Sequence, residues 1–111
     1  MAQRLPIQVG TVVVATRRTG VCDVGEPGVC YEVYELGGRP GYSFIFRSGR
    51  YDGFSPDEVE QFLQVTDQVC RATAGYQFRN VNQLARDFEA GLFAPAFPLV
   101  SAPAPQGPRP L

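Results

Sequence analysis

The fold is decided by residues 29–47, which read Val-Cys-Tyr-Glu-Val-Tyr-Glu-Leu-Gly-Gly-Arg-Pro-Gly-Tyr-Ser-Phe-Ile-Phe-Arg. In Val29–Leu36 the side chains alternate with a period of two, which places Glu32 and Tyr34 with Cys30 on one face of a strand. The same period recurs in residues 42–47, and the glycine-rich residues 37–41 between the two runs predict a turn. The sequence therefore predicts an antiparallel hairpin at the centre of the molecule.

Further short strands are predicted on both sides of this hairpin. Thr11–Thr16 is rich in β-branched residues, and a long polar loop, residues 17–28, separates it from the hairpin. After the turn Ser48–Arg50, Tyr51–Phe54 is predicted as a short fourth strand. Several short strands joined by glycine turns are typical of a small antiparallel barrel or meander.

Two helix starts follow the strands. Ser55 precedes Pro56 and has a glutamate three residues later, which is the pattern of a capping box. Whether residues 59–70 continue as a helix, or turn into a strand after one helical turn, stays open at this stage. Asn80 begins a second helix that Gly91 ends. Four residues at helical spacing predict its buried stripe: Val81, Leu84, Ala85 and Phe88.

Residues 94–111 hold six of the ten prolines and are predicted as a flexible, extended tail, with Phe93 and Phe97 holding its start to the body. The tail is either an inert terminus or a ligand, because Pro105 and Pro108 have PxxP spacing and Arg109 follows them. The chain of 111 residues is thus predicted to form one domain, residues 1–93, followed by the tail 94–111.

Composition excludes several classes of function. All ten basic residues are arginine, so the chain has no lysine and no histidine, and it also has no tryptophan. Catalysis by Ser-His-Asp or Cys-His sets within one chain is excluded, as is Schiff-base chemistry. The three cysteines, Cys22, Cys30 and Cys70, lack the paired spacing of a zinc site and are predicted to be buried, reduced thiols, although Cys22 and Cys30 could pair across two strands. We expect no cofactor, no metal, no membrane span and a cytoplasmic protein.

The charged residues give no surplus for binding nucleic acid. The formal net charge is −1, and residues 1–54 carry six arginines against five acids. The arginines of a nucleic-acid hypothesis lie on loops and strands: Arg17, Arg18, Arg39, Arg47 and Arg50. The acids Asp57, Glu58 and Glu60 lie where a first helical turn favours negative charge. The glycine-rich segments 20–25 and 37–41 do not join a strand to a helix, so they are predicted to be turns rather than phosphate cradles.

Residues 9–59 resemble the SH3-like small barrels, including the KOW type. Four segments carry the resemblance: residues 9–14, residues 25–29, Tyr42–Phe46 and residues 49–56. In those families a long loop separates the first two strands and a short 3₁₀ turn precedes the last. The resemblance implies a closed barrel over about residues 8–66, with residues 67–93 added as a cap over an open barrel end or a sheet edge. The chain lacks the tryptophan of the groove that binds proline-rich ligands and the basic surface of KOW barrels.

We therefore predict an α+β domain, a small antiparallel SH3-like barrel followed by a C-terminal helix and the proline-rich tail. The predicted function is a non-enzymatic protein-binding or adaptor module, monomeric or weakly dimeric, that binds a protein partner through an aromatic barrel rim. Its binding residues are predicted to be Tyr34, Tyr42, Tyr51, Arg39 and Arg50. The alternative is a nucleic-acid-associated accessory protein that uses loop arginines. A third, weaker hypothesis is a hydrolase or lyase that uses Asp52 and Glu58 near Tyr51.

Overall fold

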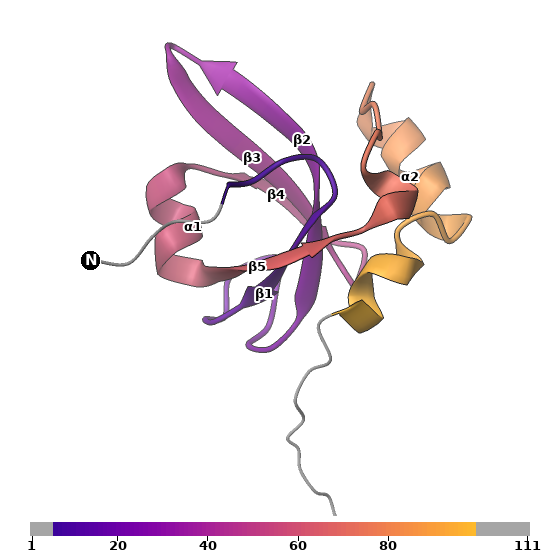
Figure 1. The fold of residues 1–111 in the computed structure, drawn as a ribbon, viewed down its shortest axis with the longest axis horizontal. Coiled ribbons are helices and arrows are strands. Elements are labelled where there is room, and N and C mark those ends of the chain that lie inside the picture. The colour runs from indigo at the N-terminus through magenta and orange to yellow at the C-terminus, as the bar shows by residue number, and fades with distance from the viewer. Residues whose placement is uncertain (1–5, 100–111) are drawn as a thin grey trace, which may run out of the picture.

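A computed structural model describes residues 6–99 and contains one five-stranded antiparallel sheet with the strand order β4-β3-β2-β1-β5. The strands are β1 (Thr11–Ala15), β2 (Pro27–Leu36), β3 (Arg39–Phe46), β4 (Tyr51–Phe54) and β5 (Leu63–Val69). The helical segments are α1 (Pro56–Phe62), η1 (Arg71–Thr73), α2 (Val81–Glu89) and η2 (Ala94–Leu99). The predicted α+β class is confirmed. Figure 1 shows the sheet between α1 on one side and α2 on the other.

The predicted closed barrel is wrong, because the sheet is open. β4 and β5 are its two edge strands and do not pair with each other. The seven-residue α1 lies between them in the chain, and β5 then pairs with β1. A barrel buries one face of its sheet inside itself, whereas here each face has a core of its own under a different helix. Both cores are therefore buried without closure of the sheet into a barrel.

The two cores define two faces of the sheet. The α1 face includes Val13, Phe44 and Phe54, which pack with Val59 of α1. The α2 face includes Val12 and Ile45, which pack with Leu84 and Phe93. The C-terminal segment therefore covers a face of the sheet, and the predicted position over a barrel end or a sheet edge is wrong.

The central hairpin is tighter than predicted. Leu36 pairs with Arg39, and Gly37 and Gly38 between them have φ of 61° and 81°. Two successive residues with positive φ form the two-residue turn whose twist matches that of the strands, and glycine adopts it without strain. β3 therefore begins at Arg39, and the predicted turn over residues 37–41 is too long.

A β-bulge in β2 changes which side chains share a face. The register with β3 shifts between Cys30 and Glu32, so that Glu32 lies opposite Ser43. Cys30 packs in the core of the α1 face, while Glu32 and, two residues later, Tyr34 lie on the α2 face. The prediction that these three residues share one face is wrong, because the extra residue of a bulge reverses the alternation beyond it.

Both predicted helix starts are confirmed. Ser55 Oγ accepts a hydrogen bond from the Glu58 backbone N–H at 3.2 Å, and Glu58 Oε1 accepts one from the Ser55 N–H at 2.9 Å. Asn80 Oδ1 accepts from the Gln83 N–H at 2.8 Å. Of the two alternatives for residues 59–70, the structure has the short helix, which ends at Phe62 and is followed directly by β5.

The C-terminal segment differs from its prediction in two places. Leu84 is fully buried, but Val81 is 48% exposed and Ala85 is also exposed, so only part of the predicted stripe faces the core. Residues 94–99 form η2, whose Ala96 is buried, although they were predicted as the start of an extended tail. Phe93 is buried, as expected of a residue that holds this segment to the sheet. The PxxP segment lies outside the described residues, and none of the helices in residues 6–99 is long and apolar enough to span a membrane.

Candidate functional site

The structure brings three of the five predicted binding residues to one face of the sheet. Tyr34 pairs with Gly41 in the β2–β3 register, Tyr51 pairs with the α2-face residue Ile45, and Arg39 lies two residues before Gly41 on β3. Since side chains alternate along a strand, Tyr34, Arg39 and Tyr51 all lie on the α2 face.

The other two predicted residues lie elsewhere. Tyr42 pairs with Phe54 and packs against the core of the α1 face, on the opposite side of the sheet. Arg50 lies in the turn between β3 and β4, where its Nε donates to Ser48 Oγ at 3.1 Å. The five residues therefore do not form one groove.

The Tyr34 ring crosses the sheet over two glycines. A Cβ atom on Gly41 would lie 2.3 Å from Tyr34 Cε2, and one on Gly53 would lie 2.6 Å from the Tyr34 hydroxyl. The ring thus extends from β2 across β3 to β4. Its place is possible only because neither glycine has a side chain, and both lie in strands, where glycine is otherwise unfavourable.

Tyr51 borders a groove between β4 and α2. The groove has a volume of about 250 Å³, and its wall from the β3–β4 hairpin consists of Ile45, Ser48, Gly49 and Tyr51. Its wall from α2 consists of Leu84, Ala85, Phe88 and Glu89. Tyr51 is 41% exposed, and its ring meets that of Tyr31 edge to face, with the centroids 6.4 Å apart. The groove combines apolar walls with one half-exposed tyrosine and one carboxylate, which suits it to hold a side chain of another molecule.

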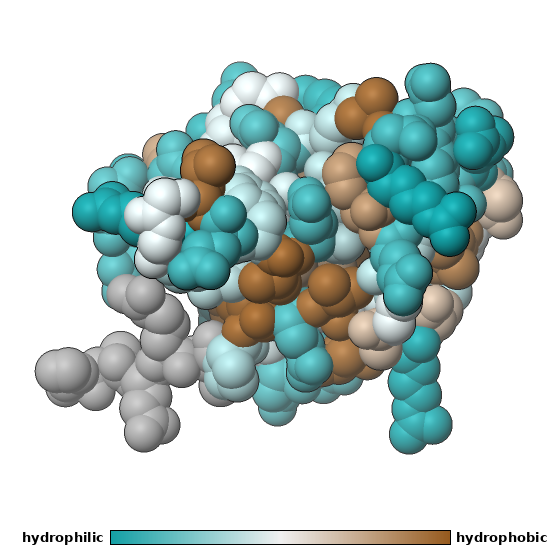
Figure 2. Space-filling model, turned by 90° about the horizontal axis from the view of Figure 1, so that it is seen from above, coloured by the Kyte–Doolittle hydropathy of each residue, from teal (hydrophilic) through white to brown (hydrophobic). Residues whose placement is uncertain are grey.

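Exposed apolar side chains are not confined to this groove. Within residues 6–99, seven large apolar residues are exposed: Val24, Val33, Leu36, Tyr51, Val69, Val81 and Leu99. Seen from above, hydrophobic residues gather near the middle of the view with hydrophilic ones around them (Figure 2). Among these residues, Tyr51 borders an apolar hollow, the groove beside α2.

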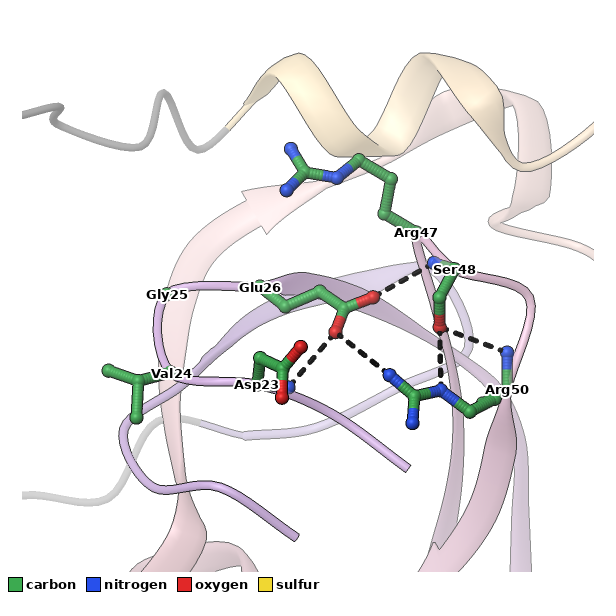
Figure 3. A pocket seen from close by; sticks show the side chains of 7 residues that line it. All are labelled: Asp23, Val24, Gly25, Glu26, Arg47, Ser48 and Arg50. Carbon is green, nitrogen blue, oxygen red and sulfur yellow. Dashed lines mark hydrogen bonds and ion pairs between the residues drawn. The ribbon is translucent and has the colours of Figure 1, made fainter. Parts of the chain in front are cut away.

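A second hollow has a volume of about 540 Å³, and Glu26 makes most of the interactions between its lining residues (Figure 3). Glu26 is 7% exposed, and its two carboxylate oxygens accept hydrogen bonds from the backbone N–H groups of Asp23 at 3.0 Å and Ser48 at 2.8 Å. An Arg50 nitrogen lies 4.0 Å from Oε1. The carboxylate thus links the β1–β2 loop to the β3–β4 turn, and each of its oxygens accepts a backbone hydrogen bond. We interpret it as structural.

The same hollow bears on the nucleic-acid hypothesis. Arg47 and Arg50 line it, but so do Asp23 and Glu26. Arg18 of the β1–β2 loop lies 3.3 Å from Asp23. Carboxylates beside these arginines reduce the positive potential that phosphate binding requires.

A third hollow, of about 330 Å³, contains two of the residues of the hydrolase hypothesis. Asp52 and Glu58 line it together with Phe54 and Phe62. Asp52 Oδ1 accepts from the Gly53 N–H at 2.7 Å, and Glu58 completes the cap of α1. Tyr51 lies on the other face of the sheet, so the structure does not bring the three predicted residues together.

The cysteines are buried and free, as predicted, and the alternative pair Cys22–Cys30 is not formed. Burial raises the pKa of the Cys30 thiol to about 12 and also raises that of Cys22. Burial likewise raises the pKa of Tyr31 to about 12. All these groups are neutral near pH 7, which makes them packing residues rather than nucleophiles. Within residues 6–99 no three cysteine or acidic side chains are grouped as metal ligands would be.

Comparisons with protein families, with curated proteins and with solved structures found no match to this chain. Sequence reasoning missed Gly41 and Gly53, which make room for the ring of Tyr34, and Glu89, which lines the groove opposite the β3–β4 hairpin. The one signal for Glu89 was its spacing of four from Ala85, which places both on the same line along α2.

Proposed function

We propose that this protein is a non-enzymatic protein-binding module, and that its binding surface is the uncovered part of the α2 face. The proposed surface consists of Tyr34 and Arg39 from the hairpin, and of Tyr51 with the groove beside it. Tyrosine and arginine are enriched where proteins bind one another, because each combines a large apolar area with a polar end.

The single observation that carries this proposal is the position of Tyr51. Its ring is 41% exposed at the border of an apolar groove, although Tyr31 beside it is buried. A partner's side chain that enters the groove would bury the exposed part of this ring together with the apolar walls beside it.

We also propose a relationship to the SH3-like small barrels, in an open form. Support comes from the long loop between β1 and β2, the short helix before β5, and the return of β5 to the side of β1. The proposal includes a cytoplasmic location, which the three buried free thiols support.

The proposal is tested by site-specific photo-crosslinking in the native host. A photoreactive phenylalanine analogue replaces Leu36, which is 74% exposed and pairs with Arg39 on the proposed surface outside the groove, or Val24, which is 67% exposed on the β1–β2 loop. We expect a discrete protein adduct from position 36 and none from position 24.

The captured protein is then purified and its affinity measured directly. Tyr51→Ala is expected to weaken binding about tenfold or more, as truncation of an interface tyrosine does. Val24→Ala, the matched exposed control, is expected to leave the affinity unchanged. Equal capture from both positions, or no loss on Tyr51→Ala, would refute the proposed surface.

A further inference from the structure

We propose that the Tyr51 groove, defined by its eight lining residues above, takes an arginine side chain from the partner protein, with the guanidinium group beside Glu89. This inference rests on the proposed function, because it names the chemistry by which the partner is recognised at the same site.

The size of the groove indicates a side chain rather than a small-molecule ligand. Its volume of about 250 Å³ lies below the range of roughly 300–1,000 Å³ that is typical of ligand pockets. Six of the eight lining residues offer carbon atoms or a glycine backbone: Ile45, Gly49, Tyr51, Leu84, Ala85 and Phe88. A long aliphatic stem fits such walls.

The charge of the groove indicates that this stem ends in a cation. Glu89 is the only charged residue among those that line it. Within residues 6–99, the ion pairs are Arg18–Asp23 and Arg50–Glu26, and Glu89 takes part in neither. Arg86, one turn earlier on α2, is not within ion-pair distance of it. Glu89 therefore offers an unpaired carboxylate at the border of an apolar hollow.

The position of Glu89 in its helix strengthens this argument. It is the last residue of α2, where the helix dipole is negative and an acidic side chain is unfavourable. Neither of the ion pairs within residues 6–99 compensates this charge. A cation from a partner would relieve the repulsion and gain attraction from both the carboxylate and the helix end.

Arginine fits the groove better than lysine does. The half-exposed ring of Tyr51 can stack against a planar guanidinium group, which is also less strongly hydrated than an ammonium group. The stem of an arginine can lie along Ala85 and Phe88, which brings its charged end toward the C-terminus of α2.

The test uses three synthetic peptides and the full chain. The probe is acetyl-Gly-Ser-Gly-Arg-Gly-Ser-Gly-amide, and its controls replace arginine with citrulline, which has nearly the same shape without the charge, or with lysine. Binding is followed by backbone amide shifts in two-dimensional NMR. We expect the arginine peptide to shift the amides of Tyr51, Ala85 and Glu89, and to bind about fivefold more tightly than the citrulline peptide. The lysine peptide should fall between them.

Two variants separate the charge from the cavity. Glu89→Gln is expected to lower the affinity for the arginine peptide about fivefold, whereas Glu35→Gln, an exposed acid of the hairpin, should leave it unchanged. Ala85→Leu, which fills the groove from an exposed helical position, should abolish the shifts while the remaining spectrum stays that of the folded protein.

Equal binding of the arginine and citrulline peptides, tighter binding of the lysine peptide, or unchanged binding by Glu89→Gln would each overturn the inference. If crosslinking from position 36 and the Tyr51→Ala measurement succeed while these peptide results fail, the binding surface stands and only its proposed ligand is wrong. If crosslinking itself fails, the proposed function is refuted separately.

Discussion

The place of the Tyr34 ring over Gly41 predicts a strong energetic coupling between the two residues. The perturbation is Gly41→Ala, made both in the natural protein and in a Tyr34→Ala background. The new methyl carbon would lie 2.3 Å from Tyr34 Cε2 and 2.4 Å from Cζ, far below the contact distance of two non-bonded carbon atoms. Gly41 does not have a positive φ, so the backbone itself accepts alanine and the clash is the only obstacle.

The expected loss in the free energy of unfolding depends on how the Tyr34 ring responds to the new methyl group. If the ring stays, the strand must shift, and overpacking of this kind costs about 1–3 kcal/mol. If the ring swings into solvent, the protein loses the contact of the ring with both glycines. We therefore expect Gly41→Ala to cost about 2 kcal/mol in the natural protein. In the Tyr34→Ala background the clash is gone, and alanine should be neutral or stabilising by about 0.5 kcal/mol.

The assay is urea denaturation followed by far-UV circular dichroism, from which the free energies of unfolding of the four proteins give a double-mutant cycle. The expected coupling is about 2–3 kcal/mol. Gly75→Ala is the matched control, because a Cβ there meets no atom within 4 Å, and it should change stability by less than about 0.5 kcal/mol. A cost of Gly41→Ala that is the same in both backgrounds would refute the position of the ring.

Three further predictions concern stability. Glu26→Gln should cost about 2 kcal/mol in urea denaturation, because it places an N–H₂ group against one of the two backbone donors, whereas Glu35→Gln should cost almost nothing. Ser55→Ala should cost about 1 kcal/mol through loss of the cap of α1, and no change in the urea midpoint would contradict that role. The pKa of Cys30 rises from 9.0 to about 12 on folding, and that of Tyr31 from 10.0 to about 12. Because the folded state holds these two protons more tightly than the unfolded state, their contribution to stability is complete below about pH 9 and is lost as the pH rises toward 12. The urea midpoint should therefore fall over that pH range. A rising midpoint would contradict the burial of Cys30 and Tyr31.

The features that the sequence predicted correctly depend on neighbours in the chain. The strand Tyr51–Phe54 was predicted with its observed bounds, since its limits are set by a glycine turn and by the cap at Ser55. The start of α2 was predicted from Asn80 for the same reason. Capping is satisfied within three residues, so a short stretch of sequence is enough to specify it.

The residues of the proposed surface were predicted only in part. Tyr34, Arg39 and Tyr51, chosen by residue type, lie on one face of the sheet, whereas Tyr42 lies on the other. Alternation alone would place Tyr34 on the same face as Tyr42, because it cannot reveal the bulge between Cys30 and Glu32. The bulge is a property of the pairing of β2 with β3, and one extra residue moves every later side chain of β2 to the opposite face.

What the sequence by itself determined is the set of local elements: the hairpin, the short strands beside it, the two capped helices and the buried thiols. What only the tertiary structure decided is the open sheet, the second core under α2, the ring of Tyr34 over two glycines, the clamp of Glu26 and the groove beside Tyr51. The physical reason is that each of these depends on contacts between residues far apart in the chain. Their energies arise from packing and pairing that no local pattern of residues contains.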